Sequence, residues 1–84
     1  MIITHITIQG VEDDLTIRRT DTGALVSTHD VDVAFDRTLD ADERYSIAYH
    51  AAKVVCGTTR RGEPNATNSM IHDILNEIQR VAGC

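Results

Sequence analysis

A continuous apolar stripe runs through residues 68–82. Its members recur every three or four positions, which is the spacing of one face of an α-helix. They are Met70, Ile71, Ile74, Leu75, Ile78, Val81 and Ala82. A helix with such a stripe must bury it against other apolar surface, and the other concentration of apolar residues lies in the first 35 positions. The sequence therefore predicts a helix packed on the N-terminal half of the chain.

Apolar and polar residues alternate in three stretches of that N-terminal half, which is the pattern of half-buried β-strands. The stretches are residues 2–9, residues 15–20 and a longer one over residues 24–35. Polar turn residues separate them. In the second turn, residues 20–23, we expect Gly23 to supply the positive φ that a tight hairpin loop requires.

The third stretch ends in strict alternation, with odd-numbered apolar residues on one face and aspartates on the other. We expect the odd-numbered face to be buried, because only the wide stripe of the last helix can cover it. The residues expected in the main core are Val31, Val33, Phe35, Ile47, Leu75 and Ile78.

A first helix is predicted to run from about residue 41 to residue 56. Asp40 and Glu43 have the spacing of a capping box at its start, and Gly57 suits its C-terminal end. The second helix is expected to end at Gly83. Three strands and then two helices predict one α+β domain over residues 1–84, a three-stranded antiparallel β-meander with both helices packed on one face (β-β-β-α-α).

Charge is distributed unevenly along the chain. Thirteen acidic and eight basic residues give a net charge of −5, which argues against non-specific attraction to nucleic acid or an anionic membrane. Residues 12–43 hold ten acidic and three basic residues, whereas residues 44–84 hold three and five. No secretion signal or membrane-spanning run is evident, so we expect a cytoplasmic protein in which Cys56 and Cys84 are free thiols.

The tetrapeptide Asp21-Thr22-Gly23-Ala24 resembles the active-site motif of retroviral-type aspartic proteases. That resemblance implies a dimer in which two such aspartates share one proton. In that family the motif follows an apolar strand that buries the aspartate, whereas here it follows Arg18-Arg19-Thr20. A hairpin turn is therefore the favoured interpretation, and we expect neither catalytic residues nor a cofactor.

Two histidines and two aspartates of the N-terminal half have side chains of the metal-ligand type. They are His5, His29, Asp30 and Asp32. His29 and the two aspartates alternate to opposite faces of the expected strand, so one ion cannot easily collect all three. We expect no metal site.

Two groups of residues in the C-terminal half have side chains suited to catalysis or phosphate binding, but their surroundings in the sequence do not support either role. Cys56 with His50 or His72 would make a nucleophile and base, but a thiol at a helix C-terminus faces the dipole end that does not lower its pKa. Arg60 and Arg61 in a polar loop would contact a phosphate, but they lack a glycine-rich cradle. An inert thiol and a solvated loop are favoured.

The remaining group is an acidic surface on the side of the sheet away from the helices. Carboxylates two residues apart on one strand lie roughly 6.6 Å apart, and like charges in such a row repel. The residues of this expected acidic face are Asp30, Asp32 and Asp36, extended by Glu12, Asp13 and Asp14. Such a face would imitate the charge of a nucleic-acid backbone and bind a protein with a basic groove. The alternative is a solvated surface without a binding role, in which Arg18 offsets the charge of one carboxylate from the neighbouring strand.

In size, charge and order of elements the chain resembles small phage-encoded anti-CRISPR proteins. The resemblance carries no motif and transfers no residues. It implies a non-enzymatic inhibitor in the host cytoplasm that binds a CRISPR effector or nuclease, without direct contact to nucleic acid or membrane. The alternative is a structural or assembly module that self-associates, as in a homodimer, through a sheet edge or through Tyr45 and Tyr49.

Overall fold

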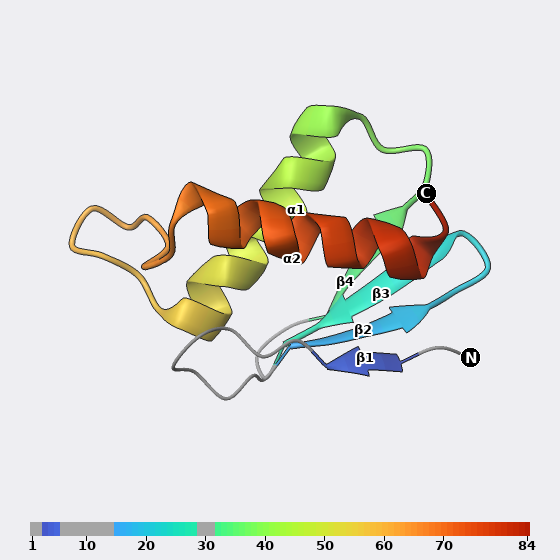
Figure 1. Ribbon diagram of the computed structural model, residues 1–84, viewed down its shortest axis with the longest axis horizontal. Helices are drawn as coiled ribbons and strands as arrows, with labels where there is room; N and C mark the ends of the chain where they lie inside the picture. The colour runs from blue at the N-terminus through green and yellow to red at the C-terminus, as the bar shows by residue number, and fades with distance from the viewer. Residues whose placement is uncertain (1–2, 6–14, 29–31) are drawn as a thin grey trace.

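The computed structural model describes residues 3–5, 15–28 and 32–84, with the backbone alone described for the first of these ranges. The elements in chain order are β1 (Ile3–His5), β2 (Thr16–Arg19), β3 (Gly23–Ser27), β4 (Asp32–Asp36), α1 (Ala41–Cys56) and α2 (Asn68–Ala82) (Figure 1). Antiparallel strands followed by two helices confirm the predicted α+β class.

The described strands pair in the order β1-β2-β3-β4, each antiparallel to the next. The stretch expected as one long third strand, residues 24–35, forms two of them. Ser27 pairs with Asp32, so the chain reverses between these residues. The meander is therefore one strand longer than expected, while its direction and its place before the helices are as predicted.

The phase of burial explains why one strand becomes two. In β3 the buried side chains are the even-numbered Ala24 and Val26, whereas in β4 the buried one is the odd-numbered Phe35. Side chains of an uninterrupted strand alternate with a period of two and cannot change phase. The expectation that the odd-numbered face is buried thus holds for β4 and fails for β3.

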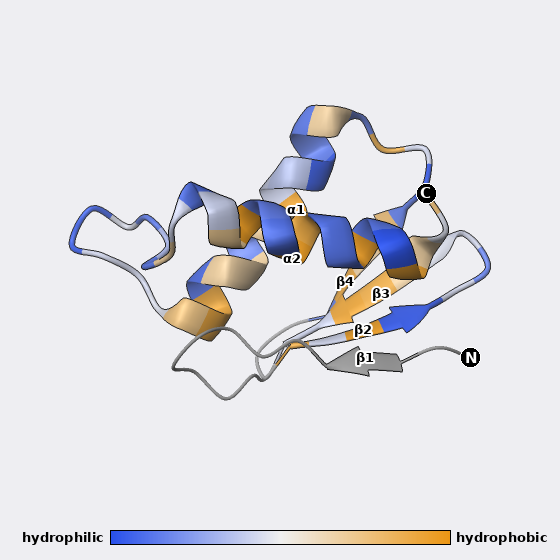
Figure 2. Ribbon diagram, in the orientation of Figure 1, coloured by the Kyte–Doolittle hydropathy of each residue, from blue (hydrophilic) through white to orange (hydrophobic). Residues whose placement is uncertain are grey.

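Both helices lie on one face of the sheet, as predicted (Figure 1). α2 packs across β2 and β3, while α1 packs mainly on α2 and reaches β4 at fewer points. Figure 2 shows hydrophobic residues on β3 and on α2, the helix that lies across it. The buried apolar residues are Leu15, Ile17, Ala24, Val26, Phe35, Ala48, Ala51, Ala52, Val55, Ile71, Ile74, Ile78, Val81 and Ala82.

α2 is the predicted amphipathic helix. The Thr67 hydroxyl accepts a hydrogen bond from the Met70 N–H at 3.2 Å and so caps its first turn. Gly83 ends the helix in the left-handed conformation, with φ 84°. Leu75 is only half-buried and packs against the margin of the core, because Ile74 and Ile78 occupy the centre of the stripe.

α1 begins at its predicted cap. The Asp40 carboxylate accepts a hydrogen bond from the Glu43 N–H at 2.9 Å, and Gly57 ends the helix with φ 80°. Its buried side chains are mostly alanines, which let the two helices approach closely. Ile47 and Val33, expected in the main core, are half-buried at its margin, and Val31 lies outside the described residues.

Candidate functional site

The expected acidic face falls partly within the described residues. Asp32 is exposed and Asp36 half-exposed at the two ends of β4, and both alternate with the buried Phe35. They therefore face away from the helices, as predicted. The other expected members lie outside the described residues: Glu12, Asp13, Asp14 and Asp30.

The two described carboxylates act separately. Asp36 lies four positions after Asp32, which is about 13 Å along a strand. This exceeds the Debye length of about 8 Å at physiological salt, so most of their mutual repulsion is screened. The repulsion expected between neighbouring carboxylates does not apply to this pair.

Asp36 also has a structural task. Its carboxylate accepts hydrogen bonds from the N–H and the hydroxyl of Thr38, both at 2.8 Å. These two bonds, the backbone one first, lower the pKa of Asp36 below its ordinary value of 3.8. Its carbonyl accepts from the Leu39 N–H at 3.1 Å. Asp36 thus holds the turn that leads from β4 toward α1 and stays ionised while doing so.

Arg18 lies on the same outer face but not beside either aspartate. Its partner across the strands is Leu25, and Leu25 in turn pairs with Ala34. Two strand spacings, about 10 Å, therefore separate Arg18 from β4. Within the described part of the chain, no ion pair joins Arg18 to Asp32 or Asp36.

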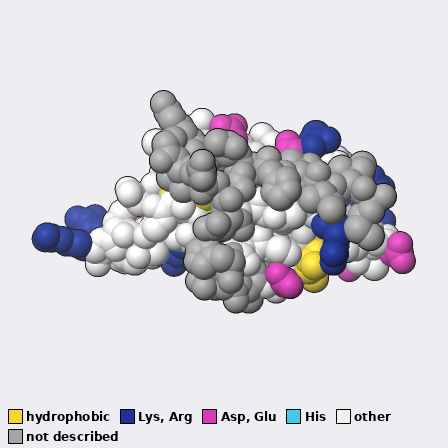
Figure 3. Space-filling view, turned by 90° about the horizontal axis from the view of Figure 1, so that it is seen from below, with side chains coloured by type: hydrophobic (Ala, Val, Ile, Leu, Met, Phe, Trp, Pro, Cys, Tyr) yellow, Lys and Arg dark blue, Asp and Glu magenta, His cyan; other side chains and the backbone are white. Residues whose placement is uncertain are grey.

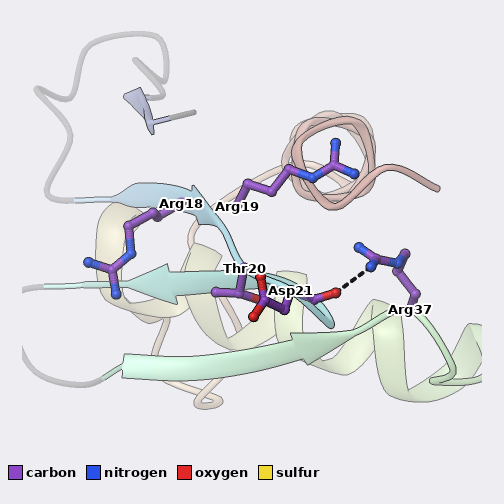
Figure 4. Close-up of a pocket in the computed structure, with 5 residues that line it drawn as sticks. All are labelled: Arg18, Arg19, Thr20, Asp21 and Arg37. Atoms are coloured by element: carbon purple, nitrogen blue, oxygen red, sulfur yellow. Dashed lines mark hydrogen bonds between the residues drawn. The ribbon is translucent and has the colours of Figure 1, made fainter. Parts of the chain in front are cut away.

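A shallow hollow at the β2–β3 turn gathers three arginines that sequence reasoning did not group. Its lining residues are Arg18, Arg19, Thr20, Asp21 and Arg37 (Figure 4). Arg37 reaches this turn only through strand pairing, where its N–H donates to the Thr22 carbonyl at 3.0 Å. In the sequence, only the adjacent pair Arg18 and Arg19 beside a predicted turn pointed to this group of arginines.

This hollow is not built to hold an anion. The guanidinium groups point in different directions in Figure 4, since Arg18 and Arg19 are neighbours on one strand. Arg37 is already engaged, because it donates to the Asp21 carbonyl at 2.6 Å and to the Ala82 carbonyl at 2.8 Å. A cation suits the C-terminal end of α2, so Arg37 ties that end to the turn.

The protease-like tetrapeptide forms the predicted hairpin turn. The Thr20 N–H donates to the Gly23 carbonyl at 3.0 Å, and Asp21 is exposed. The expected positive φ at Gly23 is wrong. A Cβ at this position would lie 2.0 Å from the Phe35 carbonyl oxygen, so glycine is required for the close approach of β3 and β4.

Four aromatic rings and one lysine form a cluster across the two helices, which we call the aromatic patch: Tyr45, Tyr49, His50, Lys53 and His72. The Tyr45 ring lies 6.1 Å from the Tyr49 ring and 5.5 Å from the His72 ring, measured between centroids. Lys53 Nζ lies 5.0 Å from the centroid of Tyr49. Both tyrosines are half-buried, and both histidines are exposed. The helical spacing of Tyr45 and Tyr49 predicted part of this patch, and helix packing adds His72.

Neither thiol forms a disulfide. Cys56 is half-buried and Cys84 is exposed, and both are free, as expected. Burial raises the pKa of the Cys56 thiol above its ordinary value, which lowers its fraction of reactive thiolate. The histidines of the aromatic patch lie against the tyrosine rings, so no thiol–imidazole pair is formed by the described contacts.

The loop over residues 57–65 carries Arg60 and Arg61, the two arginines that the sequence offers for contact with a phosphate. Its base is closed by a hydrogen bond from the Asn65 N–H to the Gly57 carbonyl, 2.8 Å long. Arg60 and Arg61 are exposed, and Figure 3 shows basic side chains projecting at this end of the molecule. Two projecting side chains without a concave cradle give no phosphate pocket.

Within the described ranges, no group of three or more histidines, cysteines, aspartates or glutamates lies close enough to hold a metal ion. His29 and Asp30 of the considered metal group are outside those ranges, as is the side chain of His5. Neither α1 nor α2 combines the length and apolar character needed to cross a bilayer. No family model, curated protein or solved structure matches this chain.

Proposed function

We propose that this chain is a non-enzymatic inhibitor that binds a partner protein through the acidic outer face of its sheet. The observation that supports the proposal is the position of Asp32 and Asp36 at the two ends of β4, on the strand face opposite the buried Phe35 and so away from both helices. Ala34 between them is exposed and small, so a partner can approach the strand closely.

The proposed partner has a basic groove. The resemblance to anti-CRISPR proteins makes the nucleic-acid channel of a CRISPR effector the first candidate. A net charge of −5 would speed association with such a groove and would discourage direct contact with nucleic acid. The acidic face would then occupy the place of a phosphate backbone and keep nucleic acid out.

The test uses capture of CRISPR effectors from bacterial lysate by the whole chain, followed by affinity measurement at low and physiological salt. Asp32→Asn with Asp36→Asn should weaken binding and flatten its salt dependence, because two steering charges are lost. Asparagine keeps an acceptor for the two Thr38 donors, so the variant should still fold, and thermal unfolding checks this. Glu63→Gln with Asp73→Asn removes the same charge from exposed sites away from the sheet and is the matched control.

Equal affinity and equal salt dependence in the two double variants would refute a role for the acidic face. The nuclease activity of any captured effector supplies the second readout. An inhibitor must lower that activity, and a chain that binds without lowering it is not one.

Self-association is a second candidate function, and the aromatic patch favours it. Tyr45 and Tyr49, two of the three Phe, Trp and Tyr residues of the chain, lie together at the margin of the core, where each is half-buried and keeps part of its ring exposed. Tyrosine is enriched at protein interfaces because it combines apolar area with a polar tip. Sedimentation equilibrium should then show a dimer that Tyr49→Ser dissociates and that the aspartate variants leave intact. A monomer at all concentrations would dismiss this function.

A further inference from the structure

β4 has an open edge. It is the last strand in the order of the described sheet, and no described strand pairs with its far side. The Arg37 N–H donates to the Thr22 carbonyl of the neighbouring chain segment at 3.0 Å. Because hydrogen-bonded residues alternate along an antiparallel pair, the backbone groups of Phe35 and Val33 also face β3. Those of Ala34 face the open edge.

A narrow apolar crevice lies between the Val33 end of β4 and α1. Its lining residues are Val26, Thr28, Val33, Ile47, His50, Ala51 and Val54. Val33, Ile47 and Val54 are all half-buried, so their exposed parts form apolar walls beside the edge. At about 40 Å³ the crevice suits one small aliphatic side chain and excludes an aromatic ring.

Edge and crevice together match the requirements of strand addition. In this mode an extended peptide forms backbone hydrogen bonds with an edge strand, while alternate side chains enter pockets beside it. The inward side chain opposite Val33 would point toward the crevice. The outward side chains at the two ends would stand beside Asp32 and Asp36, where cross-strand pairs of opposite charge are favourable.

We propose that β4 is the docking edge for an extended segment of the partner protein, which joins the sheet as an additional strand. This segment carries basic residues beside Asp32 and Asp36 and a small aliphatic residue in the crevice. The proposal rests on the proposed function and specifies how the acidic face is engaged.

Charge distinguishes this occupant from a second copy of the chain. Two β4 strands paired antiparallel about Ala34 would place Asp32 of each copy opposite Asp36 of the other. Like charges directly opposite one another destabilise a strand pair, and charged edge strands are a common protection against self-pairing. A basic segment turns the same two carboxylates into favourable contacts.

The probe is the peptide acetyl-Lys-Val-Thr-Val-Lys-amide, added to the full chain in an NMR titration. Its lysines would face the two aspartates, its threonine would pair with Ala34, and one valine would enter the crevice. We expect amide shifts at residues 32–36 together with shifts in the half of α1 that lines the crevice. The matched peptide with glutamates in place of lysines should bind at least about tenfold more weakly.

Backbone pairing is tested on both partners. Ala34→Pro removes the N–H that faces the open edge and should weaken binding by about tenfold, whereas Ala34→Thr keeps the N–H and should not. Thermal unfolding checks that Ala34→Pro is folded. N-methylation of the peptide's threonine removes the other bond of this pair, from the threonine N–H to the Ala34 carbonyl, without altering the protein, so the test does not depend on the folding of a variant.

Strand addition would be overturned by shifts elsewhere on the molecule, or by equal binding of the plain and N-methylated peptides. Absence of any shift at millimolar peptide would overturn it as well. The proposed function can hold where strand addition fails. If a captured effector binds Ala34→Pro normally but binds Asp32→Asn with Asp36→Asn weakly, the acidic face is the binding surface and the edge is not.

Discussion

The two helices contact the rest of the molecule in different ways. α2 lays isoleucines and valine directly on β2 and β3, and its buried residues form an unbroken stripe. α1 turns mostly alanines inward, packs on α2, and has half-buried side chains along both margins. One margin carries the two tyrosines of the aromatic patch and the other carries Ile47 and Val54 of the crevice beside β4, and the exposed His50 takes part in both surfaces. Both candidate binding surfaces of the helical layer therefore lie along α1, the helix with the smaller share of the core.

The largest expected effect contrasts an inner residue of α2 with a marginal one of α1. Ile78→Ala should destabilise the fold by about 2–5 kcal/mol, since Ile78 is fully buried and the change leaves a cavity. Ile47→Ala should lower the free energy of unfolding by about 1 kcal/mol, because the Ile47 side chain is only partly buried. Urea denaturation of both variants measures the contrast. Equal losses would show that α1 supports the core as strongly as α2.

The next effect concerns the close contact between the helices. Ala52 is fully buried on α1, so Ala52→Leu should overpack this contact and cost about 1–3 kcal/mol. Ser46→Leu adds a similar volume at an exposed position of the same helix and should change stability by no more than about 0.5 kcal/mol. Thermal and chemical unfolding compare the two variants. A neutral Ala52→Leu would mean that the helices can separate at little cost.

A smaller effect is expected where Arg37 holds the end of α2. Arg37→Ala removes hydrogen bonds to the Asp21 and Ala82 carbonyls and should cost about 1 kcal/mol, given partial exposure. Hydrogen exchange should accelerate in the last turn of α2 and not in α1. Arg18→Ala removes the same charge without these bonds and serves as the control. If hydrogen exchange accelerated equally in both helices, Arg37 would not stabilise the end of α2 specifically.

The smallest effect concerns the turn that leads from β4 to α1. Two hydrogen bonds from Thr38 lower the pKa of Asp36, so the folded state binds this proton less readily than the unfolded state. The stabilisation is complete above the ordinary value of 3.8 and disappears as pH falls through the lowered folded pKa. Thr38→Val should therefore be less stable than wild type near neutral pH and match it at the acidic end. An NMR titration of Asp36 together with urea midpoints tests this, and a pH-independent difference would assign the effect to packing.

Local sequence was sufficient for the start of α1 and for the C-terminal ends of both helices, whereas three residues, Asn65, Thr67 and Asn68, were equally suited to cap the start of α2. Asp40, Gly57 and Gly83 act as the caps that their positions predict, because capping depends on residues within one turn of each other. The stripe of α2 also follows from spacing alone. Spacing alone did not predict how deeply each residue of the stripe is buried. Leu75 and Ile74 are neighbours in the same pattern, and the position of the sheet decided which one is fully buried.

The candidate site depended more heavily on pairing between distant residues. The sequence placed Asp32 and Asp36 on one face, since side chains alternate along any strand. It did not reveal that β4 is an edge, that its Ala34 is exposed between the aspartates, or that Val54 lies beside Val33. Strand order and helix packing determine those neighbours, and neither is encoded in the spacing of one segment.

The sequence by itself determined where α1 begins and where both helices end, that the sheet has one apolar face, and that the first half of the chain is acidic. Each of these follows from interactions within a few residues or from composition. The tertiary structure decided that residues 24–35 turn back on themselves, that Gly23 is needed for contact with Phe35, and that Arg37 joins a turn to the end of α2. These depend on the burial of the whole core, which selects one register among many that local preferences allow.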